Sequence, residues 1–144
     1  MKRGYYGIGI YQGKTTANLG TLWRSAQNFS ASFIFTIGKR YKKQTSDTTK
    51  AFRHIPLYSY DTINDFLKSR PYDCQLIGIE QSERSVDVAK FTHPERAIYL
   101  LGAEDTGLPE SVQSLCQSII HIKSPMFLNV AVAGSIIMYD RISK

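Results

Sequence analysis

Two segments in the last third of the chain combine residue types that suit a ligand site. The first runs from Leu100 to Pro109, where a short apolar stretch ends in an acidic turn bracketed by Gly102 and Gly107. The second runs from Leu128 to Gly134 and is apolar except for Asn129. Glycine lets backbone come close to a ligand because no Cβ intervenes. These segments therefore indicate a site where backbone wraps a small ligand and one polar side chain is fixed beside it.

A third segment, Gly7 to Thr15, nearly matches two phosphate-binding loops. A P-loop would need glycine at position 8, which is Ile8, and the dinucleotide fingerprint would need glycine at position 12, which is Gln12. Both matches fail at a glycine that would let backbone approach a phosphate. We therefore exclude nucleotide hydrolysis and hydride transfer.

Other catalytic or metal-binding patterns are missing from the sequence. His54, His93 and His121 are far apart, and none has a Cys or His neighbour at metal-ligand spacing, so we expect no metal. Cys74 and Cys116 form no metal or disulfide pattern and are expected to be buried free thiols of a cytosolic protein. No Gly-x-Ser-x-Gly elbow accompanies the serines, which argues against a hydrolytic triad.

Length and charge narrow the class of protein further. The 144 residues suit a single domain over residues 1–144, and no apolar stretch approaches a membrane span or an export signal, so we expect a cytoplasmic protein. The net charge of +6 is concentrated in residues 1–50, where nine Lys and Arg face one acid. The densest run is Lys39-Arg40-Tyr41-Lys42-Lys43. Such a patch attracts a polyphosphate backbone, although a single charge run is more often a solvated loop.

The elements that must position these residues alternate between strands and helices, which predicts an α/β domain with a largely parallel sheet. The final helix is apolar nearly all round in its first half, so we expect that half to be buried. We expect a helix capped by Thr16 or Asn18 that ends near Asn28, and a second helix capped by Asp61. A third helix should start at Pro109, and the final helix should run from Phe127 to Ile142. The predicted strands are 5–11, 32–37, 54–58, 74–79, 96–101 and 118–122.

Three of these segments, in this order, resemble the motifs of the SpoU/TrmH family of SPOUT RNA methyltransferases. Asn18-Leu19-Gly20-Thr21-Leu22-Trp23-Arg24 is similar to the family's Asn-x-Gly-x-x-x-Arg helix start. Leu101 to Leu108 is similar to its Gly-x-Glu-x-x-Gly turn, and Leu128 to Ala133 to its Leu-Asn-Val-Ser-Val-Ala helix start. The likeness spans almost the full length.

The resemblance implies a parallel-sheet α/β fold with a C-terminal trefoil knot, a homodimer, S-adenosylmethionine as cofactor, and methyl transfer to a ribose 2′-oxygen of tRNA or rRNA. It implies a cofactor pocket bounded by Ile79, Gly102, Gly107, Ile122 and Leu128. It also implies a catalytic group of Arg24, Glu104, Asn129 and Asn18. RNA would be bound by Arg24 together with Lys39, Arg40, Lys42 and Lys43.

Within that group, Arg24 would hold phosphate and stabilise the developing alkoxide by charge, because a guanidinium stays protonated in proteins. Glu104 would fix Arg24 or the knot loop, and Asn129 would orient the same cluster. Each residue has a simpler alternative. Asn18 and Asn129 could be helix N-caps, Glu104 an exposed turn residue, and Arg24 a surface cation.

The sequence also departs from the family. Relatives often carry Ser two residues before the Asn of the third motif, where this chain has Phe127, and the stretch from Ile122 to Asn129 is shorter than the usual knot loop. Ser124 could supply the missing hydroxyl. These departures keep open a catalytically silent RNA-binding or assembly protein, and a weaker third possibility is methylation of a base nitrogen.

Overall fold

A parallel sheet of seven strands forms the centre of the computed structural model, which describes residues 4–40 and 55–144. The strand order is β3-β2-β1-β6-β4-β7-β5, and every pairing is parallel. This confirms the predicted α/β class. The strands are β1 (Tyr5–Tyr11), β2 (Phe33–Ile37), β3 (Leu57–Tyr60), β4 (Gln75–Ile79), β5 (Val86–Asp87), β6 (Arg96–Gly102) and β7 (Ser118–His121).

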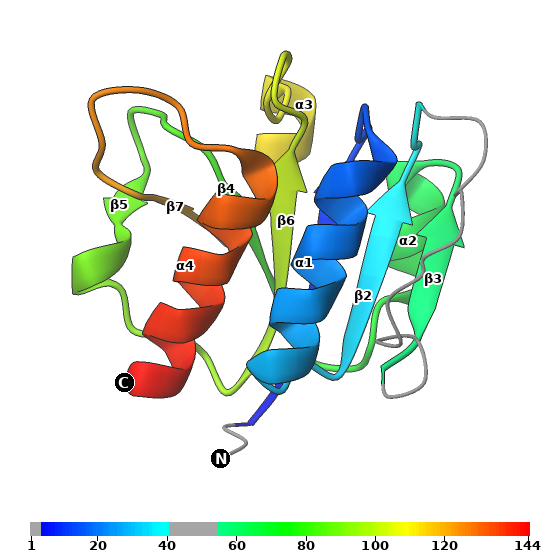
Figure 1. The fold of residues 1–144 in the computed structure, drawn as a ribbon, viewed down its shortest axis with the longest axis horizontal. Helices are drawn as coiled ribbons and strands as arrows, with labels where there is room; N and C mark the ends of the chain where they lie inside the picture. Colours follow the sequence, from blue (N-terminus) through cyan, green and yellow to red (C-terminus); the bar gives the residue numbers. More distant parts are fainter. Residues whose placement is uncertain (1–3, 41–54) are drawn as a thin grey trace.

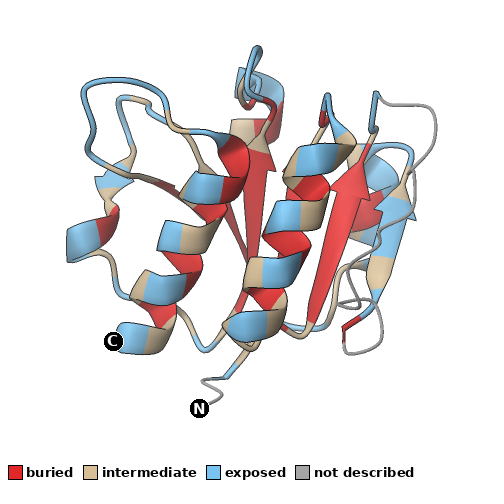
Figure 2. Cartoon of the chain, in the orientation of Figure 1, coloured by how far each residue is buried: buried red, intermediate tan, exposed pale blue. Residues whose placement is uncertain are grey.

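Helices cover both faces of the sheet (Figure 1). On one face lie α1 (Thr16–Asn28) and α4 (Val130–Ser143), which pack side by side. On the other lie α2 (Ile63–Ser69) and α3 (Glu110–Gln113), and a short 3-10 helix, η2 (Val88–Lys90), follows β5. Each face has its own hydrophobic core, and the central strands are buried on both faces (Figure 2), as expected for strands enclosed by two helical layers.

The glycines of the near-match at the start of the chain serve packing inside β1. A Cβ on Gly7 would lie 2.2 Å from the ring of Phe33, and a Cβ on Gly9 would lie 2.6 Å from the ring of Phe35. The two aromatic rings of β2 therefore occupy the space where side chains of β1 would stand. This gives Gly7 and Gly9 a structural reason that involves no phosphate.

The order of the strands creates a switch point between β1 and β6. From β1 the chain continues through α1 on one face of the sheet, whereas from β6 it continues through α3 on the other face. Ligands of open α/β sheets bind in the crevice outside the carboxyl ends of the strands at such a point. The fold therefore directs attention to the ends of β1 and β6, at the top of Figure 1.

Several predicted boundaries were wrong. The N-cap of α2 is Thr62, whose side chain accepts a hydrogen bond from Asp65 N, and not Asp61. The strand expected at 54–58 begins at Leu57 in the structure, and its predicted first residue, His54, lies outside the described residues. Neither β5 nor η2 was expected.

The prediction for the final helix also needs correction. α4 begins at Val130, after an extended segment that contains Phe127, whose exposed fraction is 90%. Its first half is not buried all round, because Val132, Ile136 and Tyr139 form an exposed apolar stripe. The cause is that the sheet and α1 cover only the inner side of α4. No helix in residues 4–40 and 55–144 is both long and apolar enough to cross a membrane.

Candidate active site

Three of the four predicted catalytic residues meet at the carboxyl edge of the sheet. Asn129 Nδ2 donates to Asn18 Oδ1 at 2.9 Å, and Asn18 Nδ2 donates to Glu104 Oε1. The three residues are up to 111 positions apart in the chain. These hydrogen bonds join the start of α1, the turn between Gly102 and Gly107, and the start of α4, which are the three segments that the sequence indicated.

Local structure explains why each side chain stands there. Asn129 is the N-cap of α4, and its Oδ1 accepts from Ala131 N at 2.8 Å and Val132 N at 3.2 Å. Asn18 lies in the first turn of α1, whose N-cap is Thr15. Asn129 is therefore a helix N-cap that also contacts Asn18, whereas Asn18 is not an N-cap. In Asn129 the cap and the contact to Asn18 use different atoms of one amide.

Glu104 sets the direction of the whole network. It lies in a tight turn after β6 that is closed by a hydrogen bond from Gly107 N to Ala103 O at 2.8 Å. An ionised carboxylate only accepts hydrogen bonds. Asn18 must therefore present its NH₂ to Glu104 and its oxygen to Asn129, which in turn presents its oxygen to the start of α4. The bonds leave one consistent orientation for both amides.

The five predicted cofactor residues lie on segments that reach the same edge of the sheet. Ile79 ends β4, Gly102 ends β6, and Ile122 follows β7 directly, so all three lie at the carboxyl edge. Ile79 and Ile122 are half-buried and pack against the core beneath α1 and α4. Gly107 closes the turn and Leu128, also half-buried, precedes Asn129.

The two glycines of the turn also serve packing within the protein. A Cβ on Gly102 would lie 2.3 Å from the carbonyl carbon of Gly107, and a Cβ on Gly107 would lie 2.2 Å from Glu80 Oε2. Gly107 also has φ +64°, which favours glycine. In the structure these spaces are filled by the chain itself. The glycines are needed for the turn to fold against β4 and β6.

Arg24 is not part of the cluster. It is exposed on the outer surface of α1 and forms no hydrogen bond or ion pair with any residue that the structure describes. It lies six residues after Asn18, which is about 9 Å along the helix axis. Glu104 contacts Asn18 and forms no hydrogen bond or ion pair with Arg24 among the described residues, so a role of Glu104 in fixing Arg24 or the knot loop stays a prediction.

Two of the described basic residues in the first third of the chain, Arg40 and Lys14, lie beside the carboxylate of Asp105. Arg40 donates to both carboxylate oxygens of Asp105, at 2.7 and 3.1 Å, and Lys14 Nζ lies 3.9 Å from Asp105 Oδ2. The hydrogen bonds from Arg40 lower the pKa of the Asp105 carboxyl and raise the pKa of the guanidinium. Lys39 is exposed beside them, whereas Lys42 and Lys43 lie outside the described residues.

Two polar residues of this edge were missed by the sequence interpretation. Glu80 follows β4 directly and bonds the glycine turn through Leu108 N at 2.8 Å. Ser82 has a buried Oγ without a hydrogen-bond partner among the residues described. An available signal was the position of Glu80, an acid immediately after a buried strand. No group of three or more potential metal ligands occurs in the described part of the chain.

Solved structures with the same fold belong to RNA methyltransferases. An rRNA methyltransferase from Sinorhizobium meliloti with bound AdoMet superposes with a TM-score of 0.85 at 22% identity, covering 99% of this chain and 57% of that one. The SpoU methyltransferase AviRb from Streptomyces viridochromogenes, also with AdoMet, gives 0.85 at 20% identity, covering 99% and 58%. At these identities the likeness establishes the fold.

Sequence comparison then defines the family. The model of the SpoU rRNA Methylase family matches residues 7–139, and this chain belongs to that family. A curated relative is the mouse tRNA (guanosine(18)-2′-O)-methyltransferase TARBP1, 26% identical over 132 residues. The match covers 85% of this chain but only 8% of TARBP1, so the chain spans a small part of that relative's length.

Proposed function

We propose that this chain is an S-adenosylmethionine-dependent ribose 2′-O-methyltransferase of tRNA or rRNA. The observation that carries the proposal is the hydrogen-bonded chain Asn129–Asn18–Glu104. It brings the three family motifs together at the carboxyl edge, beside the switch point between β1 and β6. A purely structural cap would need Asn129 alone, whereas this arrangement also fixes Asn18 and the glycine turn.

The residues at this edge fit S-adenosylmethionine. Ile79, Ile122 and Leu128 supply half-buried apolar surface of the kind that covers a purine, next to the backbone of the 102–108 turn. The buried Ser82 Oγ has no partner among the described residues, so it is available to a polar group of a ligand. When bound, the cofactor supplies an activated methyl group on a sulfonium.

The chain's own task is to prepare the acceptor hydroxyl. For the methyl group to be transferred, the ribose hydroxyl would have to lie in line with it and give up its proton to water. Arg24 holds a phosphate beside the acceptor ribose and stabilises the charge that develops on its 2′-oxygen. Asn18, Glu104 and Asn129 hold the turn and the two helix starts in fixed positions, so that little reorganisation is needed.

Charge on the same edge supports RNA as the substrate. Lys14 follows β1, Lys39 and Arg40 follow β2, and Lys123 follows β7, so these exposed cations all lie at the carboxyl edge. A phosphate backbone is bound there by displacing counterions, which makes the affinity fall with salt. We propose that Lys42 and Lys43, which continue the basic run in the sequence, also contribute to RNA binding.

We also infer a homodimer, a trefoil knot and one domain over residues 1–144, as the family suggests. The dimer is supported by the apolar stripe of Val132, Ile136 and Tyr139, which lies exposed on α4. α1 packs against α4 through Ser25 and Ser135, whose hydroxyls are 2.7 Å apart, and Arg24 is exposed on the outer surface of α1. A second copy on this face would place Arg24 at the boundary between two sites.

The first test is calorimetric titration of S-adenosylhomocysteine, followed by methyl transfer from labelled S-adenosylmethionine to total tRNA and rRNA. Nuclease digestion and mass spectrometry would then identify 2′-O-methylated nucleosides. We expect micromolar binding or better and transfer to ribose. Binding without transfer to any RNA, even with tight salt-sensitive RNA affinity, would replace the proposal with a silent RNA-binding protein.

A substitution separates the role of Arg24 from that of the cofactor pocket. Arg24→Ala should reduce transfer at least about a hundredfold, because the developing charge loses its cation, while S-adenosylhomocysteine binding stays unchanged. Lys68→Ala, which removes an exposed cation from α2 on the opposite face, is the matched control. If Arg24 works across the dimer, mixing Arg24→Ala with Asn129→Ala subunits should restore part of the activity. Loss of cofactor binding in Arg24→Ala would contradict the assigned role.

A further inference from the structure

Glu80 ties together three segments that surround the candidate cofactor pocket. Its backbone N–H donates to Ile120 O at 3.0 Å and so extends the pairing of β4 with β7. Its Oε2 accepts from Leu108 N at 2.8 Å, and its Oε1 accepts from Gln81 N at 3.0 Å. One residue thus connects the end of β4, the end of β7 and the turn after β6.

The Glu80 carboxylate contacts two neighbouring residues of the turn, Gly107 and Leu108. Oε2 occupies the place of a missing side chain at Gly107, since a Cβ there would lie 2.2 Å from it. The same oxygen accepts the N–H of the next residue, Leu108. A carboxylate that accepts backbone N–H groups makes charge-assisted bonds, which are stronger than neutral ones. The position of the turn therefore depends on the carboxylate of Glu80.

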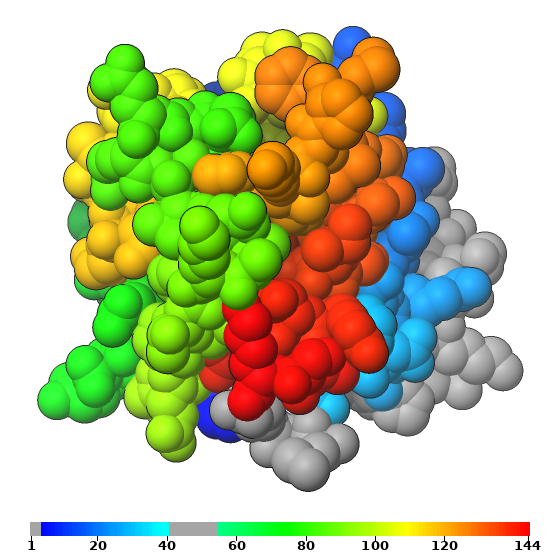
Figure 3. All heavy atoms as spheres, turned by 90° about the vertical axis from the view of Figure 1, so that its left-hand side faces the viewer, coloured from blue at the N-terminus to red at the C-terminus, as the bar shows by residue number. Residues whose placement is uncertain are grey.

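The segment that follows Glu80 contains the buried hydroxyl of Ser82. Ser82 N donates to Ser85 Oγ at 3.1 Å. The Ser85 hydroxyl in turn lies 2.8 Å from Nδ1 of His121, the residue before Ile122. Figure 3 shows the green residues after β4 and the orange residues after β7 coming together at the top of this face. Glu80 contacts both this segment, through Gln81 N, and the turn, through Leu108 N.

Its neighbour Glu83 shows what an uninvolved acid of the same segment looks like. Glu83 is exposed, and its side chain forms no hydrogen bond or ion pair with any described residue. Glu80 is half-buried, and each of its carboxylate oxygens accepts a backbone N–H. A solvated surface acid would resemble Glu83, which is exposed and bonds to no described residue, and not Glu80.

We propose that Glu80 is a positioning residue of the cofactor pocket, which holds the turn from Gly102 to Leu108 and the segment from Gln81 to Ser85 in the shape that accepts S-adenosylmethionine. The proposal rests on the proposed function. Glu80 acts through Leu108 and Gln81, and it sets how tightly the cofactor is bound. The speed of methyl transfer, once the cofactor is bound, depends on other residues.

The test uses Glu80→Gln in the full chain. A glutamine has nearly the same volume but only one accepting oxygen, so it can satisfy Leu108 N or Gln81 N and not both. We expect the Kd for S-adenosylhomocysteine and the KM for S-adenosylmethionine to rise about tenfold. The kcat at saturating cofactor and the melting temperature should stay close to those of the wild type. Glu83→Gln removes the same charge three residues away and should change none of these values.

A second variant separates position from charge. Glu80→Asp keeps the negative charge, but its carboxylate is one carbon shorter and cannot reach both N–H groups. We expect it to weaken cofactor binding as Glu80→Gln does, and restored binding would overturn the positioning role. A fall in kcat and melting temperature without a change in KM would also overturn it. If the wild type itself fails to bind S-adenosylhomocysteine, the proposed function fails, whereas equal binding by wild type and Glu80→Gln removes only this inference.

Discussion

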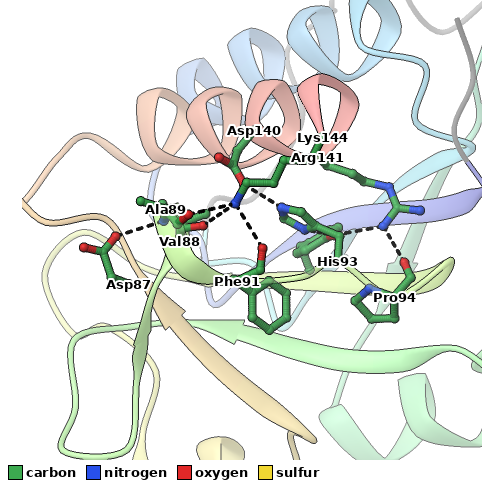
Figure 4. Close-up of polar contacts among 10 residues, drawn as sticks. Asp87, Val88, Ala89, Phe91, His93, Pro94, Asp140, Arg141 and Lys144 are labelled. Carbon is green, nitrogen blue, oxygen red and sulfur yellow. Dashed lines mark hydrogen bonds and ion pairs between the residues drawn. The ribbon is translucent and has the colours of Figure 1, made fainter.

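The two edges of the sheet carry polar clusters of opposite character. At the carboxyl edge, Asn18, Glu104 and Asn129 form a chain of side-chain bonds open to solvent. At the amino edge, His93, Tyr99, Asp140, Arg141 and Lys144 form a second chain between the last turn of α4 and the segment after η2 (Figure 4). Here His93 and Arg141 are buried, with side-chain exposure of 5% for His93.

The contacts of the amino-edge network fit one tautomer of His93. Arg141 donates to Tyr99 OH at 3.1 Å, Tyr99 OH lies 2.7 Å from His93 Nδ1, and His93 Nε2 lies 2.7 Å from Asp140 Oδ2. A neutral His93 with its proton on Nε2 can accept from Tyr99 OH and donate to Asp140, and Lys144 Nζ lies 2.9 Å from Asp140 Oδ2. Burial raises the pKa of Tyr99 to about 12 and keeps it protonated.

The difference between the edges follows from the topology. α1 and α4 start at the carboxyl edge and leave their N-terminal turns there, beside loops that change direction at the switch point. At the amino edge, α4 ends against a loop that its last turn must hold. A largely buried network stabilises the fold, whereas an exposed network with fixed amides can serve a ligand.

The largest effect on stability should come from Arg141→Met. The guanidinium donates to Pro94 O at 2.7 Å, Glu95 O at 2.8 Å and Tyr99 OH, and it lies 4.9 Å from the centre of the Tyr6 ring. Methionine leaves these buried acceptors without a donor, so the free energy of unfolding should fall by about 3 kcal/mol. Urea denaturation measures it. The control is Arg24→Met at an exposed position, which should leave the free energy of unfolding unchanged. An equal loss of stability in both variants would show that the amino-edge network does not stabilise the fold more than an exposed arginine does.

A smaller effect, on activity alone, is expected for Asn129→Asp. Aspartate keeps the oxygen that caps α4 but loses the NH₂ that donates to Asn18. The free energy of unfolding should therefore stay within about 0.5 kcal/mol of the wild type, while methyl transfer falls about tenfold or more. Asn129→Ala, which loses both contacts, should also cost about 1 kcal/mol of stability. Unchanged transfer in Asn129→Asp would reduce Asn129 to a helix cap.

The third expected effect is a loss of stability in mild acid that originates at the amino edge. Burial lowers the pKa of His93 below its ordinary 6.5, against the opposing influence of Asp140; Arg141 and Lys144 also disfavour the charged ring. The unfolded chain therefore binds this proton more readily, so the stability is complete above about pH 6.5 and declines as the pH falls toward the lowered value. Urea denaturation between pH 7.5 and 5 should show this slope, and His93→Phe should flatten it. A ring titration by NMR with its midpoint above 6.5 would contradict the assignment.

How much of this could be read from the sequence depends on the range of the interactions. Alternation and helical spacing located most strands and helices, and Asn129 at a helix start was visible as a cap. Residues Val86 and Asp87 pair with β7 over only two positions, too few for any periodicity to show. The exposed stripe of α4 was missed because an apolar helix start does not reveal which side a neighbouring helix covers.

In the candidate site, too, the contacts between residues distant in sequence could not be predicted. Asn18, Glu104 and Asn129 were selected through family motifs, and the sequence could not show that they form one hydrogen-bonded chain across as many as 111 positions. The role of Glu80 depends on its distance to Leu108, which is 28 residues away, so no local pattern contained it. Likewise, the pairing of Arg40 with Asp105 is a tertiary contact between two loops.

That pairing leads to the smallest expected effect and tests whether the carboxyl edge binds RNA at all. Asp105→Asn removes the partner of Arg40 and the nearby charge beside Lys14. Both are exposed, so stability should change little, but the two cations become available to phosphate. RNA affinity at moderate salt should rise about threefold, and the slope of log K against log salt should become steeper by roughly 0.7–0.9, equivalent to one more phosphate contact. Asp65→Asn on α2 removes the same charge from the opposite face, so equal affinities for the two variants would place the RNA surface elsewhere.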